Sequence, residues 1–422
     1  MRKLSLASSI LIPMCIATNA IASDYNIPFI NVSQLGVMYA DWATAASDAS
    51  TAFTNPAGLI KLDHQQLVFA GIGVVGSARF NGTATTPPYP FPVTVTETGA
   101  ATTRINAFIP SFYYALPLSD RVTFGFTMAP PFGIGSNYSK DSLVRYLSTH
   151  SYVVGIDMGP SLGFKINDAL SIGAGLDAVR FAFTLTNMYG IPLSYPDAEL
   201  HNHLVGWGYG WHAGVLYDAT SKTRLGFSYN SMVMEHTTGD STVYPPIPNT
   251  ELRYNNQKTN FGLPARAQLS LQHEFTPRIA AMATIFYTNW ATFSQVTMKK
   301  TMTPFGTLIS ATIPFNYHNT MDYSIGAVFK ATDQWLLRAG VQYMNTPSNN
   351  RDRGVADPVG SGTVLAVGAH YQQNARLSYD VGLAHAFFNQ MSVNVTNPLT
   401  KLVGHNNSQT NIFGGQVTWN VC

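Results

Sequence analysis

Four side chains near the middle of the sequence could together ligate a metal ion. His201 and His203 form an H-x-H pair, and Asp197 and Glu199 lie just before them. Imidazole nitrogens and carboxylate oxygens are common ligands of Zn²⁺ and related ions. No cysteine and no further acidic signature accompany the four residues. We therefore expect solvated loop histidines here and no metal site.

A serine and a histidine elsewhere could support nucleophilic catalysis. His212 and Ser270 both fall on the small and polar faces of predicted strands. A Ser–His site needs the two side chains within hydrogen-bond reach of each other. No G-x-S-x-G or comparable motif marks either residue. The sequence predicts no catalytic residue, no enzyme activity and no cofactor.

The N-terminus has the features of a secretory signal peptide. Arg2 and Lys3 begin it, an apolar stretch follows, and Ala20-Ile21-Ala22 supplies an A-x-A cleavage site. Residues 1–22 are therefore the predicted signal peptide. Its removal takes two of the 24 basic residues and none of the 22 acidic ones, leaving a net formal charge of 22 − 22 = 0. No basic excess remains for nucleic acid or anionic lipid. Cys422 is then the last cysteine, so no disulfide within the chain is possible.

Composition narrows the fold class to all-β. Only 11% of residues are charged, against about 25% in ordinary soluble proteins. Aromatic residues make up 12%, yet no apolar run beyond the N-terminus approaches the roughly 20 residues of a membrane helix. Either a large secreted β protein or a transmembrane β-barrel fits these values.

Strand periodicity favours the barrel. Along residues 207–217, Trp207, Tyr209, Trp211 and other apolar residues alternate with glycine and His212, the period-two signature of a strand. A soluble sandwich or propeller would also alternate. Aromatic residues near strand ends are, however, typical of the girdles of outer-membrane barrels.

The connections predict about 14 antiparallel strands within residues 65–422. Short polar turns occur at 118–121, 166–169, 219–223, 275–278, 331–334 and 372–376. Between them lie long segments near 82–102, 134–151, 185–205, 234–261, 294–319, 346–362 and 390–409. Tight periplasmic turns alternating with long extracellular loops are the outer-membrane pattern. A barrel of that size leaves an open lumen unless something fills it, and the apolar residues 23–64 are the predicted plug, or hatch.

Several motifs carry a family resemblance. The stretch "DASTAFTNPAGL" (48–59) resembles the Asn-Pro-Ala hatch signature of the long-chain fatty acid and aromatic hydrocarbon transporters of bacterial outer membranes. "YALPLSDRVTFGFTMAPPFGIGSNY" (114–138) is similar to the second and third strands of that family. The resemblance implies a 14-stranded barrel with a lumenal hatch, which takes up hydrophobic substrate in a groove between extracellular loops. It also implies lateral release beside a kinked third strand of the barrel.

Two short segments are expected to work in such a mechanism. Asn55, Pro56 and Ala57 would gate the hatch, because Pro56 holds Asn55 extended and the Asn55 side chain can cap nearby backbone. Pro130 and Pro131 cannot donate ladder hydrogen bonds, so the strand should bend and unpair there. With Phe132 and Gly133 these prolines form the predicted kink and lateral opening.

The remaining expectations concern substrate and surroundings. The apolar loop residues predicted to line a substrate groove are Met188, Tyr189, Ile191, Leu193, Tyr244 and Ile247. Long-chain fatty acids are favoured over aromatic hydrocarbons, with an adhesin, a barrel lipase and a water-filled porin as rivals. Either lumenal cation, Arg266 or Arg338, could meet a carboxylate. The expected setting is the Gram-negative outer membrane, with lipid and lipopolysaccharide around a monomer.

Overall fold

The computed structural model describes residue 27 and residues 29–86, 94–190, 197–358 and 360–421. The predicted signal peptide and Cys422 lie outside the described residues. No helix among those described is long and apolar enough to cross a membrane.

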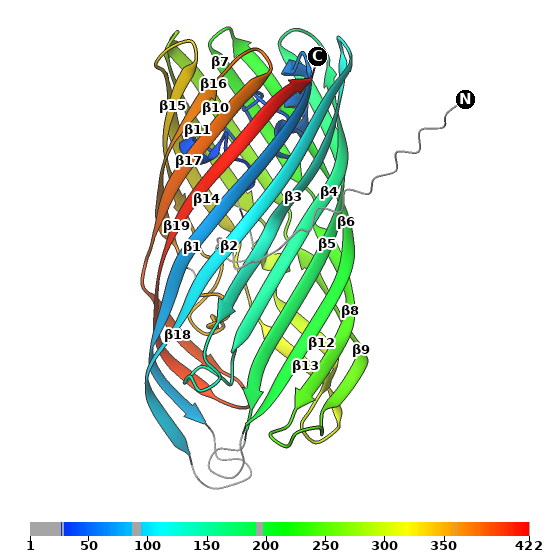
Figure 1. Ribbon diagram of the computed structural model, residues 1–422, viewed down its shortest axis with the longest axis vertical. Helices are drawn as coiled ribbons and strands as arrows, with labels where there is room; N and C mark the ends of the chain where they lie inside the picture. The colour runs from blue at the N-terminus through cyan, green and yellow to red at the C-terminus, as the bar shows by residue number, and fades with distance from the viewer. Residues whose placement is uncertain (1–26, 28, 87–93, 191–196, 359, 422) are drawn as a thin grey trace, which may run out of the picture.

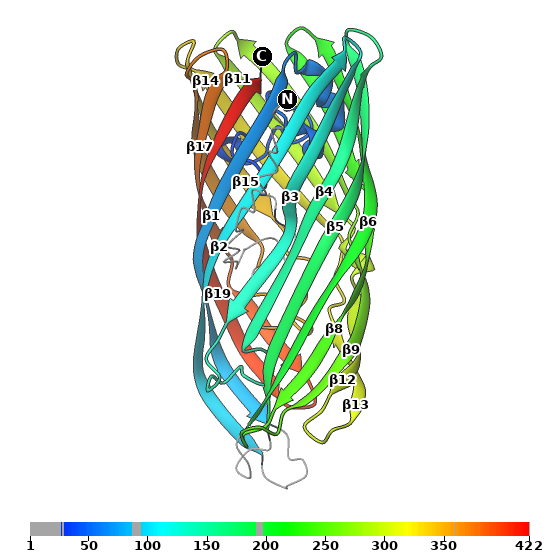
Figure 2. The same ribbon diagram turned by 45° about the vertical axis from the view of Figure 1, so that its right-hand side comes forward.

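The described residues form one closed antiparallel barrel (Figures 1 and 2). Nineteen strand segments build 14 strands, because five strands are each broken into two segments that pair with the same neighbours. Pairing of β1 with β19 closes the barrel, and this pairing runs from Gln65↔Val421 to Thr85↔Lys401. The predicted all-β fold and the strand number are confirmed.

The nine continuous strands are β1 (Gln65–Thr86), β2 (Val95–Ser119), β3 (Val122–Asn137), β4 (His150–Lys165), β5 (Leu170–Tyr189), β6 (Ala198–Thr220), β15 (Trp335–Met344), β16 (Gly362–Gln372) and β19 (Lys401–Val421). The five broken strands are β7 (Thr223–Asn230) with β8 (Val233–Tyr244), β9 (Leu252–Leu263) with β10 (Arg266–Thr276), β11 (Ile279–Thr288) with β12 (Gln295–Met302), β13 (Leu308–Pro314) with β14 (Thr320–Lys330), and β17 (Leu377–Phe388) with β18 (Met391–Thr396).

The breaks have local causes. Pro264 interrupts the strand formed by β9 and β10, because proline cannot donate to a ladder. Between β11 and β12 the chain makes a 3₁₀ turn, η3 (Trp290–Thr292), and the buried Trp290 packs into the lumen. The segment between β13 and β14 likewise contributes the buried Tyr317.

The predicted long loops prove much shorter than expected. The segment 82–102 contains the last residues of β1 and the first of β2, and the segments 185–205 and 234–261 are mostly strand. The reason is that the neighbouring strands extend equally far, so polar residues continue to pair beyond the apolar belt. The short turns lie at their predicted places, and β1 begins and β19 ends on that side of the barrel.

Residues 27–64, here called the hatch, fill the lumen near the end where the short turns lie (blue in Figure 1). The hatch contains η1 (Leu35–Val37), a short helix α1 (Thr51–Thr54) and η2 (Pro56–Lys61). Most of its side chains are buried, including Tyr39, Trp42 and Phe53. Its low charge and many apolar residues allow this, since burial removes apolar surface from water.

Small residues in the wall make room for the hatch backbone. At ten inward-facing glycines on ten different strands, an added Cβ would come closer than 3.0 Å to an atom of the hatch. At six of them that atom belongs to the hatch backbone, and at the other four it belongs to a hatch side chain. Close approach of another segment is a reason for glycine inside a strand. These residues are Gly125, Gly163, Gly173, Gly214, Gly226, Gly326, Gly340, Gly368, Gly382 and Gly414.

Candidate hatch, wall opening and lumenal cavity

The Asn-Pro-Ala segment joins the hatch to the wall. Asn55 has an extended backbone (φ −160°, ψ 99°), and its Oδ1 accepts a hydrogen bond from Ala57 N at 3.1 Å. Its Nδ2 donates to Ala43 O at 2.6 Å and to Val215 O on β6 at 3.0 Å. Pro56 begins η2, where its missing N–H costs nothing. The predicted extended geometry and cap are present, while the gating role stays a prediction.

The two residues considered for catalysis hold the hatch instead. His212 binds Asp177 through Nδ1 at 2.6 Å and Ala52 O of the hatch through Nε2 at 2.9 Å. Ser270 Oγ accepts from Ala43 N at 2.9 Å. Both polar groups of the histidine are therefore engaged with fixed partners. Strand periodicity predicted the correct face for both residues but not their contacts with the hatch.

Backbone pairing between β2 and β3 is lost beside the predicted kink, until Asn137 N at the end of β3 donates to Thr103 Oγ1 of β2 at 2.7 Å. This break in the hydrogen bonding of the wall is here called the wall opening. The β2–β3 ladder runs only from Ser119↔Val122 to Phe112↔Met128 and then stops. On its other edge β3 stays paired with β4, with a bulge between Ala129 and Phe132. Figure 2 shows β3 leaving β2 at this level and continuing beside β4.

The four predicted kink residues divide into two pairs. Pro130 and Pro131 form the unpaired bulge, whereas Phe132 and Gly133 rejoin the ladder opposite Gly155 and Val154. The hatch reaches this bulge directly, because Ile27 N donates to Pro131 O at 2.8 Å. The first described residue of the hatch thus contacts the edge of the wall opening.

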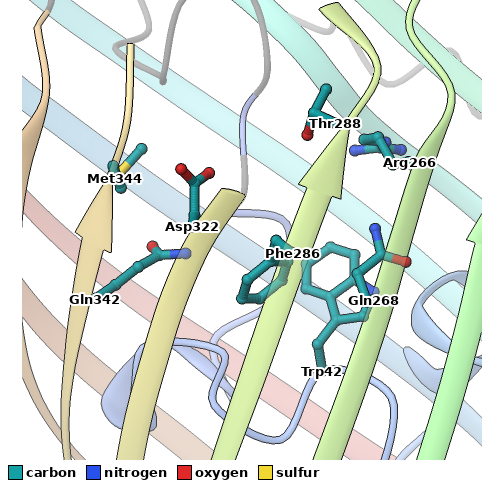
Figure 3. A pocket seen from close by; sticks show the side chains of 8 residues that line it. All are labelled: Trp42, Arg266, Gln268, Phe286, Thr288, Asp322, Gln342 and Met344. Atoms are coloured by element: carbon teal, nitrogen blue, oxygen red, sulfur yellow. The ribbon is translucent and has the colours of Figure 1, made fainter. Parts of the chain in front are cut away.

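A small pocket lies between the hatch and the opposite wall (Figure 3). Trp42 of the hatch and Phe286 and Met344 of the wall form its apolar lining, with Arg266 at one end. The full lining is Trp42, Arg266, Gln268, Phe286, Thr288, Asp322, Gln342 and Met344. The enclosed space measures about 10 Å³, about enough for one water molecule, so with the hatch in this position the pocket holds no fatty acid chain.

Arg266 links this cavity to the hatch and the kink. Its guanidinium carbon lies 5.1 Å from the ring centre of Phe132 on β3 and 5.8 Å from that of Phe53 in the hatch. Cation–π contacts at such distances are attractive. Arg338, the other lumenal cation considered, is ion-paired with Asp380. Of the two cations, the structure brings only Arg266 to the cavity.

An aromatic cluster that the sequence did not predict lines the lumen on the loop side of the hatch. Phe181 lies 4.8 Å from Phe261, which lies 6.1 Å from Phe293, between ring centres. Tyr317 stacks on Phe293 at 5.6 Å. Phe132 belongs to the same buried apolar cluster. This packed apolar cluster therefore extends to β3 beside the wall opening.

The predicted groove residues are only partly brought together. Met188 at the end of β5 and Tyr244 at the end of β8 both stand in register with Glu199 on β6, and Tyr189 follows Met188. Met188 is buried, while Tyr244 and Ile247 are 44% and 61% exposed. Ile191 and Leu193 lie outside the described residues. Met188, Tyr189 and Tyr244 are strand residues, so the prediction that they belong to loops was wrong.

A network of polar side chains ties the loop 138–149 over the barrel mouth. Arg145 pairs with Glu97 at 2.9 Å and with Asp197 at 3.1 Å, and Tyr146 Oη donates to Asp197 Oδ1 at 3.0 Å. Burial, followed by the Asp197 charge, raises the pKa of Tyr146 to about 12. The phenol therefore stays neutral and keeps donating, which holds the loop 138–149 against Asp197.

The H-x-H pair lies in strand β6 rather than in a loop, because β6 extends beyond the apolar belt. His203 Nδ1 lies 2.8 Å from Thr184 Oγ1 on the neighbouring strand. Among the described residues, no group of three or more His, Cys, Asp or Glu is placed to hold a metal ion.

Comparison with known proteins gives a match over almost the whole chain. A family model described as "Outer membrane protein transport protein (OMPP1/FadL/TodX)" matches residues 13–420. Outer membrane protein P1 of Haemophilus influenzae is 25% identical over 409 residues, 87% of each chain. The long-chain fatty acid transport protein of Escherichia coli O6:H1 is 23% identical over 407 residues, 88% of each chain.

Solved structures share the architecture. A Pseudomonas aeruginosa FadL homologue superimposes with a TM-score of 0.83 at 24% identity, covering 94% of this chain and 99% of that chain. The Ralstonia pickettii toluene transporter TbuX gives a TM-score of 0.66 at 16% identity, covering 93% and 98%. At these identities the likeness is one of fold.

Proposed function

Because the chain belongs to the outer membrane protein transport family (OMPP1/FadL/TodX), we propose that it admits hydrophobic molecules, long-chain fatty acids above all, passively through the outer membrane. Members of this family are transporters and not enzymes. The proposed route runs from the loop side along the aromatic cluster to the cavity and leaves sideways between β2 and β3. The chain is proposed to act as a monomer.

The observation that carries this proposal is the end of the β2–β3 ladder at Phe112↔Met128, beside the Pro130-Pro131 bulge. A water-soluble solute would gain nothing from an opening that faces lipid. An apolar solute gains free energy there, because its apolar surface leaves water. The contact of Ile27 N with Pro131 O supports coupling between hatch position and this opening.

Fatty acids are favoured by the chemistry of the cavity. Arg266 stands at one end of a lining that includes Trp42, Phe286 and Met344, so a carboxylate and an alkyl chain would both find matching groups once movement of the hatch widens this space. The named fatty acid transport relative points the same way. Aromatic hydrocarbons are the second candidate, since the lumenal aromatic cluster offers ring contacts without a charge.

The test is uptake of labelled oleate and labelled toluene by cells that lack their own transporter and express this chain. In the variant P130T/P131V, two N–H donors return and the fixed φ angles are lost, so the wall can pair. We expect oleate uptake to fall several-fold. Pro160→Thr on β4 is the control, because Pro160 is a wall proline that pairs with Phe126 in the β3–β4 ladder and lies at a break of the β4–β5 ladder, away from the edge between β2 and β3.

Each outcome separates parts of the proposal. Unchanged oleate uptake in P130T/P131V would contradict lateral release through this opening. Altered uptake in Asn55→Ala, which loses the two amide donor bonds, supports gating by the hatch. Uptake of toluene alone would transfer the protein to the hydrocarbon branch. A folded barrel that admits neither compound would refute hydrophobic transport.

A further inference from the structure

Three lysines gather on the outer wall of the barrel, away from the lumenal route. Lys258 on β9 and Lys299 on β12 are direct cross-strand partners, and both are exposed. Lys300 follows at a register shift in β12, with a left-handed backbone (φ 64°), and is exposed on the same segment. Strands β8, β9 and β12 run side by side in this part of the barrel (Figure 1).

The charges of these lysines are not balanced by acidic neighbours. Among the ion pairs of the described residues, none includes Lys258, Lys299 or Lys300. Asp240, the acidic residue of β8 at this height, is paired with Arg253 at 3.5 Å. Like charges directly opposite each other destabilise a sheet. An anion bound between the two ammonium groups would remove this repulsion.

The height of the site on the wall indicates which anion. Lys258 is paired with Thr238, two residues beyond His236, which is paired with the outward Trp207. Two residues of strand span about 7 Å. Trp207 is 39% exposed and belongs to the aromatic girdle, which sits at the level of the lipid headgroups. The lysines therefore lie just outside the apolar belt, on the side of the loops.

We propose that Lys258, Lys299 and Lys300 form a binding site for the phosphate groups of an outer-leaflet glycolipid, the lipid portion of lipopolysaccharide. Phosphate oxygens accept from lysine ammonium groups as point charges. Lys300 Nζ also donates to Tyr254 Oη at 3.0 Å, which fixes one ammonium group near the wall. The acyl chains of the same lipid would cover the exposed Met234 and Trp207 below. This site is separate from transport, and its test is independent of the substrate.

The experiment measures binding of lipid A, with both phosphates and after their removal, to the purified mature barrel in detergent micelles by native mass spectrometry. We expect K258Q/K299Q to bind the phosphorylated lipid roughly 10- to 30-fold more weakly, since each lysine near a membrane surface contributes on the order of a tenfold change or somewhat less. The control K222Q/R278Q removes the same charge from exposed positions at the short turns and should bind like the wild type.

Each variant is shown to be folded by the resistance of its barrel to unfolding in detergent without heating, as for the wild type. The proposal is overturned if K258Q/K299Q binds as tightly as the wild type, or if removal of the phosphates changes nothing. Equal weakening in K222Q/R278Q would reduce the effect to net charge and overturn it as well. Displacement of the lipid by equimolar inorganic phosphate would assign the lysines to free phosphate instead of lipid.

Discussion

Gly173→Ala should release the hatch from the wall. Gly173 lies on β5, and an added Cβ would lie 2.6 Å from the Pro56 carbonyl oxygen and closer still to Pro56 C and Ala57 N. All three are backbone atoms, so no side-chain rotation can relieve the clash. Ordinary contact begins at 3.4 Å and the nearest atom, Pro56 C, would lie at 2.3 Å, so the Asn-Pro-Ala segment must move by about 1.1 Å (3.4 − 2.3).

That shift breaks the bonds that hold the segment. Ser171 Oγ donates to Ala57 O at 2.9 Å and Asn55 Nδ2 to Val215 O at 3.0 Å, so a displacement of this size takes both beyond hydrogen-bonding distance. Two such bonds contribute about 1 kcal/mol each, and residual overpacking costs about 1–3 kcal/mol. Together these effects weaken docking of the hatch by about 3–5 kcal/mol.

The assay is ion conductance of single barrels in planar bilayers, with hydrogen exchange of residues 43–60 measured in parallel. The wild type should conduct little, and Gly173→Ala should conduct more often and lose protection by 10²-fold or more, in line with about 3 kcal/mol. Gly415→Ala is the matched control, since its Cβ would meet nothing within 4 Å. Wild-type conductance and protection in Gly173→Ala would show that the hatch is not held by this close approach.

Two further predictions concern the hatch. Trp42→Ala should reduce the protection of hatch amides from hydrogen exchange by about 3–5 kcal/mol, because the Trp42 ring is 2% exposed and its centre lies 5.7 Å from that of Phe286. The control Trp335→Ala removes an exposed ring on the outer wall and should leave hydrogen exchange of the hatch unchanged. Burial raises the pKa of Asp41 from 3.8 to about 6, although the nearby Arg338 guanidinium lowers it. The hatch should therefore be most stable below pH 4 and lose stability as the pH rises from about 4 to 6, as measured by hydrogen exchange. A hatch whose stability does not depend on pH, or the same pH dependence in Asp41→Asn, would contradict this.

Local physical chemistry determined much of this protein from its sequence alone. Alternation of apolar and small or polar residues specified strands, and the short turns specified 14 of them, because a period of two suits a wall with two different faces. Pro56 and Asn55 determined their own geometry through local sterics and a side chain with one acceptor and two donors. The two prolines at 130–131 predicted a break for the same local reason.

Other features depended on partners distant in the sequence. The two prolines alone do not determine which edge of β3 loses its pairing. Pairing with β4 resumes after the bulge, whereas pairing with β2 does not, so the break lies on the β2 edge. The predicted loop lengths were too long, because a polar segment forms strand pairs whenever the neighbouring strand extends equally far. Ser270 and His212 could have served chemistry, and only the position of Ala43 and Ala52 beside them made them anchors of the hatch. A glycine in a strand permits close approach, but the backbone that approaches it is chosen by the closed barrel.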